Sequence, residues 1–381
     1  MRIGITCYPT YGGSGVVATE LGMELAARGH EIHFITYALP IRLAEMPDDP
    51  QVASRVSFHE VEVSHYPLFD YPPYELALAT QMAEVAEHYQ LDLLHVHYAI
   101  PHSVSALLAQ QMLAPRHLPF VTTLHGTDIT LIGQDRSYLP ITRFAIEQSD
   151  GVTAVSEYLR QVTVRRFNLQ KPIAVISNFV NCERYRRQEN PALRAQFARP
   201  EEPILAHLSN FRPVKRVEDV IEVFARVRRE RPAKLLLIGD GPERANAEWL
   251  VREKNLSEDV HFLGKQNRVH EKLSLADVFL LPSSMESFGL AALEAMACEV
   301  VVIATRVGGV PEVITDGEDG FLFEVGDVEG MANQVRALLS DPGRARSVAR
   351  RARATTQERF CSSLLIPRYE AFYTQVREQA G

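Results

Sequence analysis

Two glutamates eight positions apart, Glu286 and Glu294, lie in the segment whose residue types point most directly to chemistry. Glu286 belongs to a polar loop after an apolar strand, where a carboxylate could accept hydrogen bonds from sugar hydroxyls. Glu294 lies on an apolar helix expected over residues 289–298, where a carboxylate is costly without partners. It could hold a ribose diol or form a structural ion pair. The start of this helix offers unpaired amides that can bind phosphate oxygens, those of Ser287, Phe288, Gly289 and Leu290.

A second group of candidates follows the strand expected over residues 204–208. Arg212, Lys215 and Arg216 place three cations within five residues at the end of this strand. Arginine and lysine side chains can both hold a diphosphate. Two interpretations stay open, a phosphate-binding loop and a set of exposed charges before a helix.

A glycine-rich turn, GGSG at residues 12–15, separates the first expected strand from the first helix. Its free amides, among them those of Gly13 and Ser14 before the helix, favour an anion, although a tight turn with no ligand is the alternative. The pattern is not GxGxxG. Tyr37 also stands where an acidic residue would follow the second strand, which counts against a nicotinamide dinucleotide site.

Polar residues also end two further strands of the same half of the chain. The sequence HGTD, which starts at His125, follows the strand expected over residues 120–124, and His97 and Tyr98 end the strand over 93–97. Open α/β sheets bind ligands at the carboxyl ends of their strands. Arg143, on a helix expected over 140–147, could add a cation to this group. A structural histidine and an ordinary surface arginine are the alternatives.

The scaffold that must position these residues is indicated by short apolar runs that alternate with segments of helical period. We expect strands over residues 2–7, 32–36, 93–97, 120–124, 151–155, 173–176, 204–208, 234–238, 260–263, 278–281 and 300–304. We expect helices over 16–28, 82–89, 103–112, 140–147, 217–229, 289–298, 328–339 and within 341–379. This alternation predicts two successive α/β units with parallel sheets. The charged, proline-containing segment 179–202 between them is predicted to be a linker or short surface helices.

Composition and charge narrow the classes of protein that fit this pattern. The chain has 381 residues, 46% of them apolar, and a formal net charge of −8. This balance argues against a nucleic-acid partner. Four widely spaced cysteines offer no disulfide framework and no zinc site, and no apolar run has the length of a membrane span. We therefore expect a cytoplasmic globular protein with no membrane partner.

Taken in order, these patterns resemble those of glycosyltransferase family 4, retaining sugar transferases of the GT-B fold. Glu286 and Glu294 look like the family's E-x7-E signature, and IGDGP at 238–242 and VGGVPE at 307–312 are similar to two further family segments. Many members carry an arginine five residues before a conserved lysine, here Lys215. This chain has Asn210 at that position, so the phosphate role would pass to Arg212.

Within the family, the closest resemblance is to the enzymes of bacillithiol biosynthesis, in segments 4–9, 12–15, 71–74, 97–102, 121–128 and 209–212. It implies transfer of N-acetylglucosamine from UDP-GlcNAc to the hydroxyl of L-malate, the first step of that pathway. The product would be α-linked, because attack takes place on the face that the nucleotide leaves. No metal and no cofactor are implied, and a homo-oligomer stays open.

The resemblance also implies domains and residue roles. Residues 1–178 would form an acceptor-binding Rossmann-like domain facing a cleft with a UDP-sugar-binding domain, 203–360, and a C-terminal helix, 361–381, could pack back on the first domain. The donor would be bound by Gly13, Asn210, Arg212, Lys215, Gly239, Lys265, Glu286, Ser287, Phe288, Gly289, Leu290 and Glu294. Malate would be bound by Gly13, Ser14, Tyr98, Thr122 and Arg143. The implied catalytic residues are His125, Lys215, Arg212 and Glu286.

Three other functions stay open on the sequence alone. A family-4 transferase could use another small or lipid acceptor. A UDP-GlcNAc epimerase of similar two-domain form would turn over the donor with no acceptor. A binding module without activity would bind UDP and release none.

Overall fold

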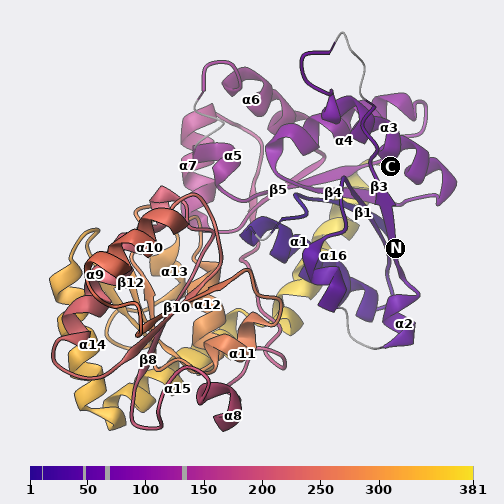
Figure 1. The fold of residues 1–381 in the computed structure, drawn as a ribbon. Coiled ribbons are helices and arrows are strands. Elements are labelled where there is room, and N and C mark those ends of the chain that lie inside the picture. The colour runs from indigo at the N-terminus through magenta and orange to yellow at the C-terminus, as the bar shows by residue number, and fades with distance from the viewer. Residues whose placement is uncertain (11, 46–48, 65–68, 131–134, 381) are drawn as a thin grey trace. The chain divides into compact units, whose positions relative to one another are not determined.

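The structure is a computed structural model that describes residues 1–10, 12–45, 49–64, 69–130 and 135–380 (Figure 1). The chain forms two compact units. Unit 1 contains Met1–Asn178 together with Ser363–Gly381, and unit 2 contains Phe179–Ser362. Each unit is a parallel sheet covered by helices, so the predicted class of two Rossmann-like units is confirmed.

The sheet of unit 1 has the strand order β3-β2-β1-β4-β5-β6-β7 among the described residues, and every pairing is parallel. Its strands are β1 (Arg2–Thr6), β2 (Glu31–Thr36), β3 (Val56–Glu60), β4 (Leu93–His97), β5 (Phe120–Leu124), β6 (Gly151–Ala154) and β7 (Ala174–Val175). The order of the strands reverses between β1 and β4. Ligands of doubly wound sheets bind at this switch point, beside the carboxyl ends of the strands.

The helices of unit 1 connect these strands and cover both faces of the sheet (Figure 1). They are α1 (Gly13–Ala27), η1 (Ile41–Glu45), α2 (Pro50–Ala53), α3 (Tyr74–His88), η2 (Ala99–Ser103), α4 (Val104–Met112), α5 (Thr127–Thr130), α6 (Leu139–Gln148), α7 (Glu157–Phe167) and the C-terminal α16 (Ser362–Ala380). Two tyrosines of α16, Tyr369 and Tyr373, are fully buried, and the Tyr373 hydroxyl shares a 2.7 Å hydrogen bond with His95 Nδ1 of β4. The last helix of the chain is therefore part of the core of unit 1.

The sheet of unit 2 repeats the same topology, with the order β10-β9-β8-β11-β12-β13 in the described part of the chain. Its strands are β8 (Ile204–Leu208), β9 (Lys234–Ile238), β10 (Val260–Gly264), β11 (Val278–Leu281), β12 (Val301–Thr305) and β13 (Phe321–Phe323). Its helices are α8 (Pro191–Arg194), η4 (Pro213–Lys215), α9 (Val217–Arg228), α10 (Arg244–Glu253), α11 (Val269–Leu273), α12 (Leu290–Ala297), α13 (Val310–Val313), α14 (Val328–Ser340) and α15 (Pro342–Arg359). Here the switch point lies between β8 and β11.

Most predicted elements exist, with shifted ends. The first helix begins at Gly13 rather than at residue 16, so Gly13 and Ser14 lie in its first turn, and α3 begins eight residues before the predicted start. Strands β3 and β13 and helices α7 and α10 were not predicted. Strand β3 is only half-buried and β13 has three residues, so neither gives a long apolar run.

The charged segment 179–202 was predicted to be a linker or short surface helices, and it contains the short helix α8. It packs along unit 2: the Arg187 guanidinium donates to the Ala276 carbonyl at 2.7 Å, and the Tyr185 ring is buried. The Arg194 guanidinium donates to the Leu275 carbonyl at 2.5 Å. Two arginines of this segment therefore bind backbone carbonyls of a neighbouring loop.

The cysteines also differ from the prediction. Cys182 and Cys361 form a disulfide with their Cα atoms 5.5 Å apart, while Cys7 and Cys298 are free and buried. The pair is 179 positions apart in the chain, so no local spacing signals it. The expectation of a cytoplasmic protein depended partly on the absence of a disulfide and loses that support.

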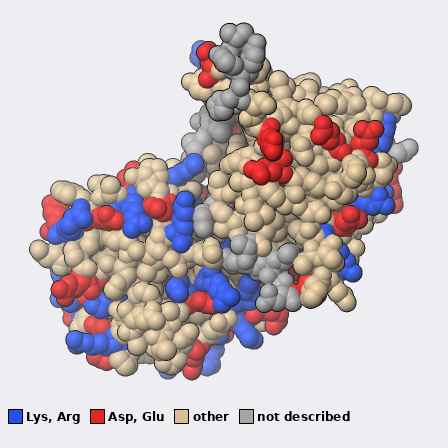
Figure 2. Space-filling model, turned by 45° about the vertical axis from the view of Figure 1, so that its right-hand side comes forward, with Lys and Arg blue, Asp and Glu red and all other residues tan. Residues whose placement is uncertain are grey.

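The composition argued against a nucleic-acid partner and against a membrane span, and the structure bears on both. Acidic and basic side chains are interspersed on the face shown in Figure 2, with no continuous basic field. Among the described residues, no helix combines the length and the apolar character that crossing a membrane requires.

Two glycines of unit 2 let the loops after β8 and β9 pack backbone against backbone. Gly239 has a φ of +115°, and a Cβ there would overlap the carbonyl oxygen of Ser209; a Cβ at Gly241 would overlap that of Asn210. Only glycine permits both the close approach and the positive φ. The shape of the loop that carries the cations therefore depends on a glycine from the next strand.

We predict that Gly239→Ala destabilises unit 2 by about 3 kcal/mol, because the new methyl group adds overlap to backbone strain. Gly317→Ala is the matched control, since Gly317 has a φ of +80° but nothing within 4 Å of the Cβ position. Strain alone should cost this variant about 1 kcal/mol. Guanidinium denaturation compares the two variants. Equal losses would show that the loops after β8 and β9 do not constrain each other.

Candidate active site

The loops after β8 and β11 meet at the switch point of unit 2. The Lys215 ammonium, at the end of η4, donates to Glu286 Oε1 at 2.7 Å, and the Ser283 hydroxyl donates to the same oxygen at 2.8 Å. The backbone amide of Ser284 donates to the Val214 carbonyl at 2.8 Å. The Glu286 side chain is 10% exposed and that of Lys215 is 21% exposed. The predicted cation and the predicted sugar-binding carboxylate are thus direct partners.

The loop after β12 supports Glu286 from its other side. The Gly309 amide donates to the Glu286 carbonyl at 3.1 Å, and a Cβ at Gly309 would overlap the Ser287 carbonyl. The Thr305 hydroxyl donates to the Ser283 carbonyl. The Glu286 loop is therefore held between two strand-end loops, which fixes where its carboxylate lies.

The second glutamate of the signature lies on α12 and is 5% exposed. Its Oε1 accepts a 2.8 Å hydrogen bond from the hydroxyl of Tyr185. Phe288 is buried at the start of this helix, and Gly289 caps it with a φ of +97°. The helix was predicted to begin at residue 289 and begins at Leu290, so the prediction is confirmed to within one residue. The amides at its start directly follow the Glu286 loop.

The remaining predicted donor residues of unit 2 lie around the ends of β8, β9 and β10, whereas Gly13 lies at the start of α1 in unit 1. Arg212 is exposed and Asn210 is half-buried, with its side-chain oxygen unpaired in the described part of the chain. Gly239 directly follows β9, and the exposed Lys265 directly follows β10. His207 of β8 was not predicted: it is buried, bonded to the Leu280 carbonyl and to the Ser209 hydroxyl, and burial lowers its pKa to about 4.

In unit 1, His125 belongs to a cluster of rings at the ends of β4 and β5. Its imidazole shares a 2.8 Å hydrogen bond with His97 and lies 5.5 Å from the ring of Tyr98. The His102 ring bonds to the His97 carbonyl at 2.5 Å. Tyr8, from the loop after β1, contacts both His102 and Tyr98 with ring centroids 4.7 and 5.3 Å apart. Residues from three strand ends thus converge at this switch point.

Burial makes these histidines neutral near pH 7. Desolvation lowers the pKa of His125 and of His95 to about 3, that of His102 to about 4, and that of His97 well below the usual value. A neutral His125 can donate or accept one hydrogen bond, but it brings no positive charge to an acidic ligand.

Asp128 ties two of the strand-end loops together. Its side chain accepts hydrogen bonds from the Gly126 amide at 2.8 Å and the Ala99 amide at 3.1 Å. Burial raises the pKa of this carboxyl to about 6, although the amide hydrogen bonds act in the opposite direction. Asp128 therefore connects the loop after β4, which carries Tyr98, with the loop after β5, which carries His125.

The other residues predicted to bind malate differ in their burial and lie on different elements. Gly13 and Ser14 form the first turn of α1, and Ser14 is 9% exposed. The Thr122 hydroxyl is fully buried on β5 and bonded at 2.8 Å to the hydroxyls of Ser103 and Ser149, so it lies inside the unit rather than at its surface. Arg143 on α6 is exposed and pairs with Glu147 at 2.9 Å. None of the hydrogen bonds found among the described residues joins Arg143 to Ser14 or Tyr98.

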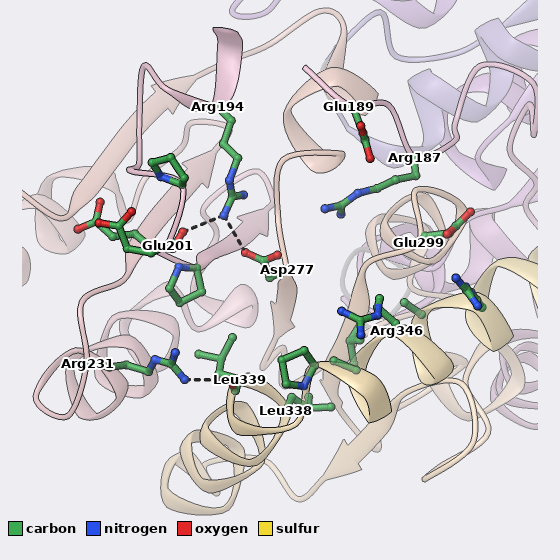
Figure 3. Close-up of a pocket in the computed structure, with 18 residues that line it drawn as sticks. Arg187, Glu189, Arg194, Glu201, Arg231, Asp277, Glu299, Leu338, Leu339 and Arg346 are labelled. Atoms are coloured by element: carbon green, nitrogen blue, oxygen red, sulfur yellow. Dashed lines mark hydrogen bonds and ion pairs between the residues drawn. The ribbon is translucent and has the colours of Figure 1, made fainter. Parts of the chain in front are cut away.

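A separate cavity of about 470 Å³ lies at the opposite ends of the unit 2 strands (Figure 3). Its lining combines five arginines with five carboxylates, among them Arg194, which donates to Asp277 at 3.3 Å. A phosphate gains little from a lining of balanced charge, so this cavity is a poor candidate for the donor site. The described residues also contain no group of three or more histidines, cysteines or carboxylates that could hold a metal ion.

The amino-acid sequence matches two domain families. Residues 11–184 match the family described as Glycosyltransferase Family 4, and residues 189–355 match the one described as Glycosyl transferases group 1. The N-acetyl-alpha-D-glucosaminyl L-malate synthase of Bacillus anthracis is 51% identical over 377 residues, which cover 99% of this chain and 97% of that protein. The chain belongs to glycosyltransferase family 4.

Solved structures show that this family-4 enzyme has the GT-B fold. A sucrose-phosphate synthase from Thermosynechococcus elongatus has a TM-score of 0.79 at 24% identity and covers 100% of both chains. Anabaena HepE, solved with UDP and glucose, has a TM-score of 0.80 at 20% identity over 100% of this chain and 99% of its own. At these identities the likeness concerns the fold alone.

Sequence reasoning missed several residues that shape the site of this glycosyltransferase. Ser283 and Tyr185 bind the two glutamates of the signature, and His207 supports the loop of cations. Ser283 could have been found from its position at a strand end three residues before Glu286. Tyr185 gives no such signal, because it lies more than a hundred positions from its partner.

We predict that unit 1 loses stability as the pH falls below about 6.5, a pH well above the pKa values of its buried histidines. The unfolded chain takes up protons below about pH 6.5, whereas folded His95, His102 and His125 resist protonation to about pH 3–4, so the free energy of unfolding falls as the pH falls through this window. Each histidine contributes up to about 1.4 kcal/mol per pH unit. Asp128, with its raised pKa, offsets one of them below pH 6.

Denaturant unfolding at pH 7.5 and pH 5 measures this dependence. His95→Gln should reduce the slope by about one proton, and His88→Gln, which changes an exposed histidine, should leave it unchanged. A stability that is the same at both pH values would contradict a neutral buried cluster.

Proposed function

We propose that this glycosyltransferase moves N-acetylglucosamine from UDP-GlcNAc to the hydroxyl of L-malate, giving α-linked GlcNAc-malate as the first step of bacillithiol biosynthesis. The observation that carries the proposal is the 51% identity, along almost the whole chain, to an enzyme named for this product. The cytoplasm as the place of the reaction and a homo-oligomer as its state stay predictions.

The donor half of the reaction is assigned to unit 2. Lys215 and the exposed Arg212 supply cations for the diphosphate, and the amides at the start of α12 supply hydrogen-bond donors for its oxygens. Glu286, held by Lys215 and Ser283, accepts hydrogen bonds from the sugar hydroxyls. Glu294 holds the ribose diol. Binding the diphosphate requires Lys215 to share its charge between Glu286 and the ligand.

The acceptor half is assigned to unit 1. Malate carries two carboxylates, which need hydrogen-bond donors and positive charge. Ser14, the amide of Gly13 and the Tyr98 hydroxyl can donate, and Arg143 supplies the cation after release from Glu147. Thr122 acts through Ser103 and Ser149, because its hydroxyl is buried among theirs. Neutral His125 contacts the donor sugar near the reacting carbon.

The bond changes follow from retention. The malate hydroxyl oxygen forms a bond to the anomeric carbon on the face from which the phosphate oxygen departs, and the hydroxyl proton passes to that oxygen. UDP leaves with both electrons of the broken bond, and Lys215 and Arg212 stabilise the developing charge. The protein therefore contributes position and electrostatics, and Glu286 forms no covalent bond. We propose no metal for this step.

We predict that the protein converts UDP-GlcNAc and L-malate to an α-linked adduct without added divalent metal. Proton NMR of the anomeric signal distinguishes the two linkages, and EDTA in the assay tests the need for a metal. A β-linked product would rule out retention. Transfer to another hydroxy acid, with none to malate, would remove the malate assignment and leave the donor assignment intact.

We predict that Lys215→Ala and Glu294→Ala each weaken UDP binding by roughly tenfold or more, since each removes a charged partner of the ligand. Arg143→Ala is the control: it removes a cation from unit 1, so it should raise the KM for malate and leave the UDP affinity unchanged. Titration calorimetry with UDP and initial rates with malate measure both. UDP affinities equal to that of the unchanged protein in the two unit 2 variants would exclude these residues from the donor site.

A further inference from the structure

Tyr185, a buried tyrosine of the charged segment 179–202, binds Glu294, the second glutamate of the signature. Its side chain is 2% exposed, and its hydroxyl donates to Glu294 Oε1 at 2.8 Å. Glu294 itself is 5% exposed on an otherwise apolar helix. A carboxylate in this setting keeps one orientation only if donors hold it. The hydrogen bond from the Tyr185 hydroxyl therefore fixes the direction in which the Glu294 carboxylate points.

The segment that carries Tyr185 is itself fixed at several points. The Arg353 guanidinium of α15 binds three carbonyls at once, those of Cys182 at 2.7 Å, Ala297 at 2.7 Å, and Tyr185. Ala297 is the last residue of α12, so Arg353 joins the Tyr185 segment directly to the helix that carries Glu294.

The disulfide lies at the start of this same segment. Cys182 is bonded to Cys361, and next to them the Val180 amide donates to the Phe360 carbonyl at 3.0 Å while the Ser362 amide donates to the Val180 carbonyl at 2.9 Å. Both cysteines are buried. Only three positions separate Cys182 from Tyr185, so the disulfide limits how far the tyrosine can move from Glu294.

We propose that Tyr185 is a positioning residue for the donor, which orients the Glu294 carboxylate toward the ribose hydroxyls, and that the Cys182–Cys361 disulfide holds Tyr185 in place. The proposal depends on the proposed function only through the assignment of Glu294 to the ribose. Reduction by a dithiol breaks the S–S bond, converts both cysteines to thiols and oxidises the reagent to its cyclic disulfide. The reduced protein then binds the nucleotide less tightly.

The test compares UDP with 2′,3′-dideoxyuridine diphosphate, which lacks the hydroxyls that Glu294 would bind. Tyr185→Phe should weaken UDP binding by roughly three- to tenfold and leave the affinity for the dideoxy analogue unchanged. A merely structural role would lower both affinities together, so that outcome would overturn the proposal. Equal affinities of Tyr185→Phe and the unchanged protein for UDP would also overturn it.

Two further variants separate the inference from the proposed function. Glu294→Gln keeps the size of the side chain and should lose affinity for UDP alone; if it loses none, the ribose assignment itself is wrong. Tyr373→Phe removes a buried hydroxyl of the same kind from unit 1, where it bonds to His95. It should lower the melting temperature and leave the UDP affinity unchanged.

A separate experiment tests the role of the disulfide. Thiol titration of the unfolded protein should find two thiols before reduction and four after it, because Cys7 and Cys298 are free. Dithiothreitol-reduced protein and the Cys182→Ser/Cys361→Ser variant should bind UDP roughly two- to fivefold more weakly, with unchanged binding of the dideoxy analogue. Four thiols before reduction, or unchanged UDP affinity after it, would contradict the role of the disulfide.

Discussion

The need to give every buried carboxylate a partner organises both units. Asp128 and Glu286 follow strand ends and Glu294 lies on α12, and each accepts a hydrogen bond from a distant part of the chain: from the Ala99 amide, from Lys215 and from Tyr185. An unpaired buried carboxylate costs several kcal/mol. The contacts of Asp128 and Glu286 also join loops that follow different strands, so the hydrogen bonds that remove this penalty also shape the site.

Close backbone packing supplies the second constraint. The loops after β8 and β9 touch at Gly239, and the loops after β11 and β12 touch at Gly309. Side chains at these positions would push the loops apart and separate Lys215 from Glu286. The glycines near the donor residues therefore act on the geometry of the ion pair, whether or not they touch the ligand.

The fold could be predicted from sequence because parallel strands buried on both faces give short apolar runs at regular intervals. The sequence also places His125, Lys215 and Glu286 after strand ends and Glu294 within a helix. It could not show that Lys215 binds Glu286, that Thr122 points into the core or that Cys182 pairs with Cys361, because these contacts join positions far apart in the chain. Within the segment 179–202, Arg187 and Arg194 bind backbone carbonyls of unit 2, and composition does not distinguish such arginines from solvated ones.

The neutral histidines of unit 1 limit how that unit could bind the acidic acceptor that we propose. A protonated His125 would supply charge beside Tyr98, but burial in a cluster with His97 and His102 lowers its pKa far below 7. Under the proposed function, positive charge would then come from a side chain that stays solvated until malate binds, and the exposed Arg143 on α6 is the side chain that we propose for this role. Its partner Glu147 lies one helical turn away and is partly exposed, so exchanging that carboxylate for one of the acceptor's would change little in solvation. A weak surface ion pair is thus better suited to this role than a buried one.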